Sequence, residues 1–510
     1  MSGKIILGDR TIATPDMLAR AARAATGLNS LVDVGEGDTV AILMRNDYPF
    51  LEATFAADFL GAYAVPVNWH FKDEEIAHIL TDAGADVLVL HADLLAGLDL
   101  SVMPAGLKLL VAATPPELQS AYGIDAGKCD VPHDQVNWSE WLEAFEPWSA
   151  PPPAQRSSMI YTSGTTGRPK GVRRQPMQPE HHKWLAGRQG LIGAAPDKVN
   201  LTNGPMYHSA PNAQTLSTIR GGGTLVLQAR FEAEDLLRLV EKHKVSHMHM
   251  VPIMFVRLSK LPDEVKARYD LSSLAWILHA AAPCPADVKR VMIDWWGPII
   301  NEYYGATETG MVVFCNTEEW LANAGTVGKA LPGVALKILD DERNELPMGE
   351  VGEIFAHFAG FTDFTYQNND AEFQTNLHDG LFSVGDVGYL NERGYLFISD
   401  RKRDMVISGG VNIYPSEIEA LIVTHPGVRD CAVFGIPDDE YGEALAAVVE
   451  PSSEGAVTST EIQDFVGENM ARYKVPRLVE LDNAMPREDS GKIRKRELRQ
   501  KYWEDSGRRI

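Results

Sequence analysis

The chain has 510 residues, of which 45% are hydrophobic and 23% are charged. This length exceeds what a single hydrophobic core usually serves, so at least two domains are expected, and the composition excludes a disordered chain. The formal net charge of -23 disfavours nonspecific binding to nucleic acid or to anionic membranes, so no nucleic-acid partner is expected.

The N-terminal part carries no signal for export or for insertion into a membrane. Residues 1–10 lack the long apolar core of a secretory signal. The longest weakly polar stretch, residues 54–67, includes Asp58 and Pro66 and is too short to span a bilayer. The cysteines are far apart and lack the spacing of metal ligands: Cys129, Cys284, Cys315 and Cys431. We therefore expect a cytoplasmic protein without a transmembrane segment or a disulfide framework.

From residue 38 onward, strand-like and helix-like runs alternate. The expected strands cover residues 40–44, 64–67 and 86–90, and the expected helices cover residues 48–62 and 73–81. This rhythm is typical of a parallel sheet covered by helices. A proline-rich stretch, residues 147–153, separates this unit from the next.

The alternation continues through the middle of the chain and then changes. The next strands are expected at residues 245–250, 276–278 and 299–304, and the next helices at residues 233–244 and 285–295. From about Val334, short strands separated by glycine turns follow. From about Arg401, a compact unit begins, with strands at residues 431–434 and 444–449 and helices at residues 415–424 and 460–472.

The predicted fold class is therefore α/β, in two parts. The first, residues 1–400, is a large N-terminal domain of helix-covered, mostly parallel sheets plus a β-rich subdomain. The second, residues 401–510, is a small α+β domain. In open sheets of this kind, ligands bind beyond the carboxyl ends of the strands. Both the alanine-rich turn at residues 280–283 and the turn near Tyr304 are expected at such ends.

One glycine- and hydroxyl-rich loop, residues 162–171 (TSGTTGRPKG), is the main candidate for binding phosphate. It follows an apolar run, residues 159–161, that is long enough for a buried strand. Glycines let backbone amides approach an anion closely, and four hydroxyls and Lys170 add donors that suit a polyphosphate. The spacing differs from the P-loop of common NTPases, because Lys170 is followed by Gly171. Taken alone, the loop is equally compatible with a flexible surface turn.

Two later segments add groups that suit a nucleotide. Residues 301–308 (NEYYGATE) contain Tyr304, whose flat ring could stack on a purine, and end in Glu308, a carboxylate suited to magnesium. Residues 382–388 (FSVGDVG) contain Asp386, which could accept hydrogen bonds from ribose hydroxyls, and Arg401 could donate to the same sugar. Read singly, these residues are also compatible with a solvated carboxylate, a core aromatic, a tight turn and a surface ion pair.

A fourth segment lies near the C-terminus. Residues 486–492 (PREDSGK) end in Lys492, which directly follows a glycine and is therefore well placed to point into a cleft. The basic residues beyond it are expected to be solvated and uninvolved: Arg494, Lys495, Arg496 and Arg499.

Taken together and in this order, the four segments resemble those of the adenylate-forming superfamily, which comprises acyl-CoA synthetases, luciferases and the adenylation domains of peptide synthetases. The resemblance covers nearly the whole chain, from the turn at residues 35–38 to Lys492. The acyl-CoA synthetase branch fits best, because of residues 406–419 (VISGGVNIYPSEIE).

The resemblance implies an ATP site with magnesium. The loop would hold the triphosphate with Thr162, Ser163, Gly164, Thr165, Thr166, Gly167 and Lys170. Adenine would lie between two walls, one made of Ala281, Ala282 and Pro283 and the other of Tyr303 and Tyr304. Thr307 would contact the α-phosphate, and Glu308 would bind Mg²⁺. Asp386 and Arg401 would hold the ribose.

The implied reaction has two steps. A carboxylate attacks the α-phosphorus of ATP, and because this brings two anions together it needs cations placed beforehand; Lys492 would reach both groups. The thiol of CoA then attacks the acyl-adenylate and displaces AMP. Between the steps, family members rotate a mobile C-terminal domain about a hinge, here Arg403, where relatives commonly have Asp or Lys. Rotation would bring three residues to the pantetheine tunnel: Ser408, Gly409 and Gly410.

The acyl side is outlined by residues 204–209 (GPMYHS), which match the family motif beside the acyl pocket. His208 would be a gate between this pocket and the CoA channel, with a packed structural histidine as the alternative. The aspartate that peptide-synthetase relatives carry at this position is absent, which argues against an amino-acid substrate. The other expected pocket residues are small or apolar, with one tyrosine nearby: Met250, Val251, Ala280 to Ala282 and Tyr303. They suit a fatty, aromatic or bulky alicyclic acid.

The C-terminal lysine motif departs from the common family pattern at Glu488 and Asp489. Similar variants are found in bacterial synthetases for bulky acids, including steroid side chains. The predicted function is an ATP-dependent acyl-CoA synthetase of fatty-acid or lipid metabolism, acting on a carboxylic acid, ATP and CoA. One alternative is a free-standing adenylation enzyme that loads a carrier protein. A non-catalytic nucleotide-binding regulator is disfavoured, because the charged site residues are all present. A homodimer is compatible with the sequence.

Overall fold

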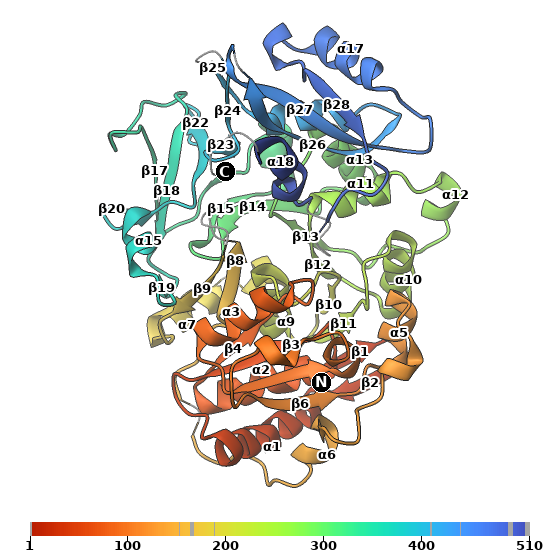
Figure 1. The fold of residues 1–510 in the computed structure, drawn as a ribbon, viewed down its shortest axis with the longest axis vertical. Coiled ribbons are helices and arrows are strands. Elements are labelled where there is room, and N and C mark those ends of the chain that lie inside the picture. The colour runs from red at the N-terminus through yellow and green to blue at the C-terminus, as the bar shows by residue number, and fades with distance from the viewer. Residues whose placement is uncertain are drawn as a thin grey trace.

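The structure of the chain is a computed structural model that describes residues 3–151, 153–163, 168–187, 189–408, 411–438, 440–487 and 493–504. Figure 1 shows the N-terminal layers, in red and orange, at the opposite end of the molecule from the C-terminal unit, in blue. No helix in the described ranges is long and apolar enough to cross a membrane.

The first layer is a parallel five-stranded sheet with the strand order β4-β3-β5-β6-β7. Its strands are β3 (Thr39–Leu43), β4 (Tyr63–Pro66), β5 (Val87–His91), β6 (Lys108–Ala112) and β7 (Val136–Asn137). Its helices are α1 (Thr14–Val32), α2 (Tyr48–Leu60), α3 (Asp73–Ala83), α4 (Ala92–Leu95), α5 (Pro116–Tyr122) and α6 (Trp138–Leu142). All pairings are parallel, which confirms the sheet type predicted from the alternation of strands and helices.

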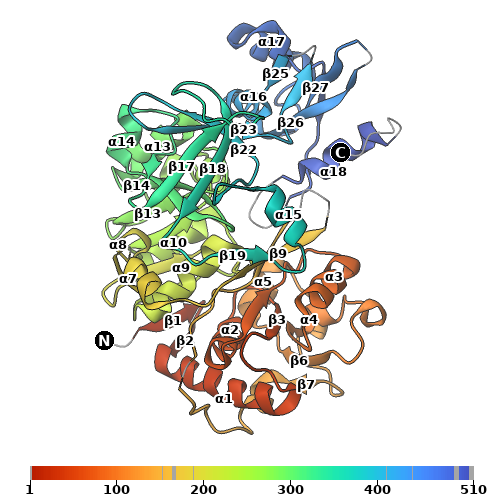
Figure 2. The ribbon, with the colours of Figure 1, turned by 90° about the vertical axis from the view of Figure 1, so that its left-hand side faces the viewer.

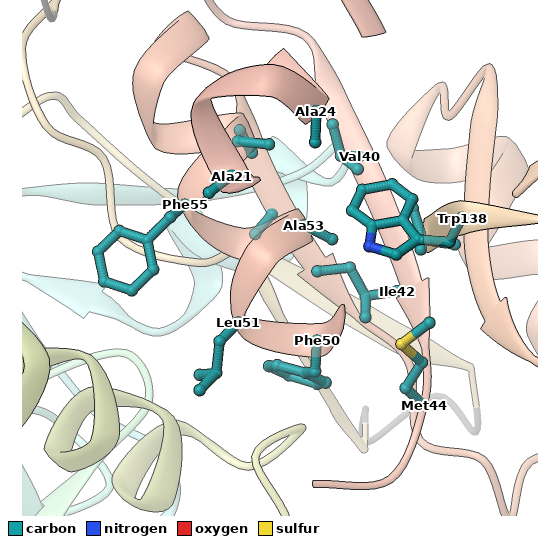
Figure 3. Close-up of a cluster of buried hydrophobic side chains, with 14 of the residues drawn as sticks. Ala21, Ala24, Val40, Ile42, Met44, Phe50, Leu51, Ala53, Phe55 and Trp138 are labelled. Carbon is teal, nitrogen blue, oxygen red and sulfur yellow. The ribbon is translucent and has the colours of Figure 1, made fainter. Parts of the chain in front are cut away.

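The core of this layer explains why α2 forms where it does. Phe50, Leu51 and Ala53 are almost completely buried, and a helix that is apolar on most sides is stable only when enclosed. Figure 3 shows these side chains in one cluster with Ala21, Ala24, Val40 and Ile42, and with Trp138 at its edge. The indole of Trp138 donates a 2.7 Å hydrogen bond from Nε1 to Oε2 of the buried Glu52.

A second sheet of nine strands has the order β16-β15-β14-β13-β12-β10-β11-β1-β2. Its strands are β1 (Lys4–Leu7), β2 (Arg10–Ala13), β10 (Val199–Thr202), β11 (Thr224–Leu227), β12 (His247–Met250), β13 (Trp276–His279), β14 (Ile300–Ala306), β15 (Gly310–Cys315) and β16 (Lys329–Ala330). Its centre is parallel and its edges are antiparallel. The joining of β1 to β11 was not predicted, because nothing local in residues 4–7 specifies a partner 220 residues away.

Helices surround this sheet. They are α7 (Pro179–Gly187), α8 (Gln189–Ile192), α9 (Ser209–Arg220), α10 (Ala233–His243), α11 (Pro252–Ser259), α12 (Asp263–Lys266), α13 (Ala286–Trp296) and α14 (Thr317–Ala322). The predicted helices at residues 233–244 and 285–295 correspond to α10 and α13.

The two ends of the glycine-rich loop lie in a pair of neighbouring strands. β8 (Ile160–Ser163) and β9 (Pro169–Arg174) pair antiparallel, and β19 (Phe364–Tyr366) joins the far side of β9. The sequence predicted β8 as a strand but not β9. In Figures 1 and 2, β9 and β19 lie between the N-terminal layers and the C-terminal unit, with α15 (Asp370–Thr375) beside them. The hairpin is therefore positioned between the main layers of the molecule.

The short strands predicted after residue 334 form an antiparallel sheet with the order β20-β21-β18-β22-β23, and β17 pairs with β18. They are β17 (Val334–Leu339), β18 (Gly352–Phe358), β20 (Leu377–His378), β21 (Leu381–Phe382), β22 (Asp386–Leu390) and β23 (Leu396–Arg401). This sheet confirms the predicted β-rich part of the fold.

The last unit has a hydrophobic core of its own, in which Ile418, Val433 and Val449 are fully buried. It contains β24 (Val406–Ser408), β25 (Val411–Ile413), β26 (Val428–Asp438), β27 (Gly442–Pro451), β28 (Leu478–Leu481), α16 (Pro415–Ile422), α17 (Ser459–Asn469) and α18 (Lys495–Trp503). The three-stranded sheet β26-β27-β28 and these helices confirm an α+β unit.

One expectation about the basic C-terminal tail is wrong. Lys495 donates a 2.7 Å bond from Nζ to Oε1 of Glu419, and burial also lowers the pKa of Arg499. The reason is that α18 lies against β26, where Trp503 donates from Nε1 to the carbonyl oxygen of Gly435 at 2.9 Å. Lys495 and Arg499 therefore pack within the C-terminal unit, whereas Arg496 is exposed to solvent as expected.

Candidate active site

Three of the residues proposed from the sequence for nucleotide binding meet in one cluster. β22 and β23 pair so that Asp386 lies opposite Arg401, and Nε of Arg401 is 3.4 Å from Oδ1 of Asp386. The hydroxyl of Tyr304, in β14, donates to Oδ2 of Asp386 at 2.8 Å. Burial, together with the Asp386 carboxylate, holds the pKa of Tyr304 well above its usual value. Two sheets thus converge on one carboxylate.

The two tyrosines of β14 point in different directions. Consecutive residues of a strand project on opposite faces, so Tyr303 and Tyr304 cannot form one continuous wall. The hydroxyl of Tyr303 lies 3.3 Å from Nε2 of His249 in β12, whereas Tyr304 faces Asp386. Burial lowers the pKa of His249 to about 4, so its imidazole is neutral at pH 7. His249 was missed from the sequence, although the alternation His-Met-His-Met at residues 247–250 marks it as facing away from the two methionines.

The alanine-rich turn follows the carboxyl end of β13, as expected. Ala281, Ala282 and Pro283 are exposed and therefore accessible to a ligand. Ala281 has a φ of 77°, in the left-handed region that costs an L-residue roughly 1–2 kcal/mol. The surrounding structure therefore enforces a backbone conformation at Ala281 that is unfavourable for alanine.

The turn after β14 carries Thr307 and Glu308. Oε1 of Glu308 accepts a 3.0 Å hydrogen bond from the hydroxyl of Tyr366 and lies 3.4 Å from Oγ1 of Thr162. The hydroxyl of Thr307 lies 3.0 Å from Oγ of Ser209, the first residue of α9. A helix N-terminus favours anions, so this position suits a phosphate. Tyr366 was not anticipated from the sequence.

Lys170 is buried beside the same carboxylate cluster. Its Nζ forms an ion pair with Glu372 of α15 and lies 4.6 Å from the centre of the Tyr366 ring. Tyr366 therefore connects the two charged residues, with its ring beside Lys170 and its hydroxyl bonded to Glu308. The partner Glu372 could not be expected from the sequence, because it is 202 residues away.

Several proposed residues lie outside the described residues: Gly164, Thr165, Thr166, Gly167, Gly409, Gly410 and Lys492. Ser163 is placed only as the last residue of β8. Ser408 ends β24, and Arg403 lies in the turn between β23 and β24. His208 directly precedes α9, where its backbone amide donates to the carbonyl oxygen of Pro205 at 3.1 Å, and its ring lies 4.6 Å from that of Tyr207.

The described residues offer little for a bound metal apart from Glu308. No group of three or more His, Cys, Asp and Glu side chains within these ranges could hold a metal ion. Mg²⁺ that arrives with ATP needs only one or two carboxylates, because phosphate oxygens and waters complete its octahedron. Glu308 follows Thr307 on the turn after β14, and its single carboxylate fits that requirement.

A buried charge pair supports the strands beneath the alanine turn. Nζ of Lys289 in α13 lies 2.5 Å from Oε2 of Glu302 in β14, and His279 of β13 lies 3.5 Å from the same oxygen. Burial lowers the pKa of His279 well below its usual value. These three side chains join α13 to the ends of β13 and β14, and none was anticipated from the sequence.

A pocket of about 240 Å³ is bordered by the Gly204–Pro205 segment. It is lined by Arg45, Asn46, Trp69, His70, Tyr122, Asn203, Gly204, Pro205, Gln228, Ala229, Arg230, Phe231, Arg257 and Arg487. Four arginines and four aromatic rings therefore surround one small space, and the sequence did not reveal it, because its residues come from seven separate segments.

The arginines of this pocket differ in how they are balanced. Arg45 lies 4.5 Å and 4.7 Å from the ring centres of Trp69 and Tyr122 and bonds to Asp93, and Arg487 bonds to Asp430 and Glu450. Among the described residues, no carboxylate lies within ion-pair distance of Arg230 or Arg257. Burial, with Arg487 nearby, lowers the pKa of Arg257. The pocket is therefore suited to an anion.

Comparison with known proteins gives two matches to family models, one in each part of the chain. Residues 4–362 match the family model of AMP-binding enzymes, and residues 417–492 match that of the AMP-binding enzyme C-terminal domain. A feruloyl-CoA synthase of an Amycolatopsis species is 32% identical over 504 residues, which cover 97% of this chain and 95% of that protein. ScoC, a fatty acid–acyl-carrier-protein ligase of Streptomyces coeruleorubidus, is 29% identical, and the aligned region covers 99% of this chain and 94% of ScoC.

Solved structures agree with the architecture. The crystal structure of ATP-bound MatB from Rhodopseudomonas palustris superposes with a TM-score of 0.81 at 25% sequence identity, and the match covers 99% of this chain and 97% of that one. The family model alone spans most of the sequence, and the feruloyl-CoA synthase is similar along nearly its whole length. The chain therefore belongs to the AMP-binding enzyme family, and it is an enzyme of the acyl-CoA ligase type.

Proposed function

We propose that this enzyme is an ATP-dependent carboxylate–CoA ligase that works through an acyl-adenylate. The observation that supports this best is the single electrostatic site made by Tyr304, Asp386, Arg401 and Glu308. Asp386 and Glu308 both act on the pKa of Tyr304 and of Arg401, although the four residues come from separate segments. Such a site offers an aromatic face, an acceptor for ribose hydroxyls and a carboxylate for a cation.

In this proposal, ATP binds across the hairpin β8–β9 and the ends of β13 and β14. Asp386 and Arg401 hold the ribose, and adenine lies between the turn at Ala281 and the ring of Tyr304. The triphosphate lies along the loop and Lys170, which exchanges Glu372 for phosphate oxygens. Mg²⁺ at Glu308 would neutralise part of the phosphate charge. Thr307, beside the N-terminus of α9, faces the α-phosphate.

The first step joins the acid to AMP. A carboxylate oxygen attacks the α-phosphorus, the bond to pyrophosphate breaks, and pyrophosphate leaves. Donors placed in advance stabilise the charge that gathers there, and Lys492 remains the candidate for the catalytic cation that approaches from the C-terminal unit. In the second step, a thiol attacks the acyl carbon and AMP leaves.

The arginine pocket supports CoA as the thiol substrate. CoA carries a 3′-phosphate and a diphosphate on an adenosine, which match Arg230 and Arg257 and the surrounding aromatic rings. A carrier protein presents only a phosphopantetheine arm, which would leave most of these groups unused. Loading of a carrier, which the name of ScoC assigns to that relative, is the second candidate function.

The acid is proposed to be aromatic, fatty or alicyclic, in line with the similarity to the feruloyl-CoA synthase. His208, Met250, Val251 and the turn at residues 280–282 would line its pocket. The neutral His249, which faces away from Met250, and the hydroxyl of Tyr303 offer one polar position on the opposite face of β12. A steroid-like acid remains within this class.

The two steps are proposed to use two orientations of a domain comprising residues 401–510 relative to residues 1–400, with Arg403 as the hinge. One observation favours a second docking position for the hairpin β24–β25. Its apolar residues Ile407 and Val411 are 50% and 45% exposed, and neighbouring exposed apolar side chains are typical of a surface that docks elsewhere. Rotation would place them, with Ser408, Gly409 and Gly410, beside the acyl-adenylate.

A cytoplasmic location of the enzyme remains a prediction.

The experiment is a screen of carboxylic acids with Mg-ATP and CoA, measuring pyrophosphate release and thioester by mass spectrometry. Arg230→Ala and Arg257→Ala should raise KM for CoA by about tenfold and leave KM for ATP unchanged, since hydrogen bonds to charged groups contribute ~1.5–3 kcal/mol. Arg238→Ala, an exposed arginine that pairs with Asp235 within α10, is the matched control. Thioester on a carrier protein but not on CoA would favour the second candidate, and neither pyrophosphate nor thioester would refute both.

A further inference from the structure

A buried arginine next to the proposed ATP site has no part in the roles described so far. Arg174 is the last residue of β9, the strand that leads away from the glycine-rich loop, and it is 4% exposed. Alternate residues of a strand share a face, so Arg174 lies on the same side of β9 as Lys170, while Arg173 lies on the other.

The guanidinium of Arg174 donates three hydrogen bonds, all to backbone carbonyl oxygens. Nη2 lies 2.5 Å from the oxygen of Thr307 and 2.6 Å from that of Glu308, and Nη1 lies 2.6 Å from that of Thr362. Its carbon Cζ lies 3.9 Å from the centre of the Phe361 ring. One side chain therefore joins the strand after the loop to the turn that carries Thr307 and Glu308.

The charge of Arg174 has no direct counter-ion. Within the described ranges, no carboxylate lies within ion-pair distance of its guanidinium. The guanidinium group of an arginine stays charged at neutral pH, and the carboxylates of Glu308 and Asp363 lie further away. A buried cation held only by neutral carbonyls is costly, and a polyanion bound nearby would offset part of that cost.

We propose that Arg174 is a positioning residue for ATP, which holds the Thr307–Glu308 turn against the strand of the glycine-rich loop. The fork of the guanidinium sets the distance between the two segments that would contact the α-phosphate and the magnesium-bound phosphates. Its charge also makes the site more favourable for a polyphosphate. This inference rests on the proposed function, because it assumes that ATP binds between these segments.

The test compares Arg174→Gln, Arg174→Lys and Arg173→Gln by calorimetric titration with Mg-ATP, without acid or CoA. Arg173→Gln is the matched control. It removes the same charge from the same strand, but the side chain of Arg173 bonds to Gln367 and Gly37 and not to the Thr307–Glu308 turn. We expect Arg174→Gln to weaken Mg-ATP binding by about tenfold or more, because a charged three-bond fork is lost. Arg174→Lys should lose less, since it keeps the charge but one ammonium cannot reproduce the fork. Arg173→Gln should bind like the wild type.

Thermal unfolding without ligand separates this role from a merely structural one. If Arg174→Gln unfolds at a lower temperature yet binds Mg-ATP like the wild type, the proposal is overturned. An equal loss in Arg173→Gln also overturns it. Should Arg174→Gln fail to fold, Arg174→Lys decides: a severalfold loss of affinity supports the proposal, and wild-type affinity refutes it. If the wild type itself binds no Mg-ATP, the proposed function and this role both fail, which distinguishes that result from a failure of Arg174 alone.

Discussion

The hydroxyl of Tyr304 donates a 2.8 Å hydrogen bond to Oδ2 of Asp386, a residue 82 positions further along the chain. This bond joins the nine-stranded sheet to the β-rich sheet. It also orients the carboxylate that we propose to hold the ribose, so one tyrosine could both stack on adenine and fix the sugar-binding group. The neighbouring Tyr303 takes no part in it.

Tyr304→Phe keeps the ring and removes the bond. KM for ATP should rise by about 3- to 10-fold, because a neutral hydrogen bond contributes ~0.5–1.5 kcal/mol. Tyr303→Phe is the matched control, since its hydroxyl faces His249 and not Asp386. Steady-state kinetics at saturating acid and CoA measure both. An equal increase in KM for ATP in the two variants would contradict the division of the tyrosines between opposite faces.

Ala281→Gly should stabilise the protein. Ala281 has a φ of 77°, which glycine adopts freely, whereas an L-residue is strained there. Relief of that strain exceeds the extra entropy of glycine in the unfolded chain, so a net gain of about 0.5 to 1 kcal/mol is expected in the free energy of unfolding. Ala282→Gly lacks a positive φ to relieve and should lose stability by a similar amount. Denaturant unfolding of both variants tests this, and the same sign in both would count against it.

Stability should fall as the pH decreases from 6.5 towards 4. The pKa of His249 is lowered by burial from 6.5 to about 4, and that of His247 likewise. In this window the unfolded chain binds protons that the folded chain excludes, so acidification favours unfolding. Each histidine should contribute roughly 3 kcal/mol across the window. Because the pKa of His279 is lowered as well, three histidines share the effect, and His249→Gln should flatten the pH dependence of the unfolding free energy by about a third. An unchanged slope would show that its imidazole is not excluded from protonation.

Lys260→Met should change the balance between the two half-reactions. Nζ of Lys260, just after α11, lies 2.9 Å from the carbonyl oxygen of Val428 and 3.3 Å from that of Arg429, at the start of β26. Loss of these bonds destabilises the present orientation of the C-terminal unit, so the ratio of acyl-adenylate formation to thioester formation should shift by about threefold or more. Lys266→Met removes a similar charge that pairs with Asp263 within α12, and it should leave the ratio unchanged. Rapid-quench assays of each half-reaction measure the ratio.

Arg403→Pro should spare acyl-adenylate formation and block thioester formation. Proline fixes φ near -65° and prevents the backbone rotation that the proposed hinge requires. Arg403→Ala, which removes the side chain but leaves the backbone free, is the control and should retain turnover. Normal overall turnover of Arg403→Pro would place the hinge elsewhere.

Local patterns were sufficient for the strands and helices that the sequence analysis named, but other elements, among them the helices α1 and α9, were not predicted. The strand predicted at residues 86–90 is β5, and the helix predicted at residues 48–62 is α2, because hydrophobic periodicity and glycine caps are encoded within each segment. The strands β1 and β9 were not predicted, for two different reasons. β1 is too short to stand out, and β9 is a charged strand (PKGVRR) that becomes a strand only through pairing with β8 and β19.

The amino-acid sequence by itself determined the family, the α/β class and the order of the four candidate segments, because these depend on residue types at fixed short spacings. Only the tertiary structure decided which residues meet: Lys170 with Glu372, Tyr366 with Glu308, Arg174 with the Thr307–Glu308 turn, and four arginines around one pocket. Such contacts join segments from tens to more than 400 residues apart, as for Arg45 and Arg487, and their geometry is set by sheet register and burial, which no local pattern contains.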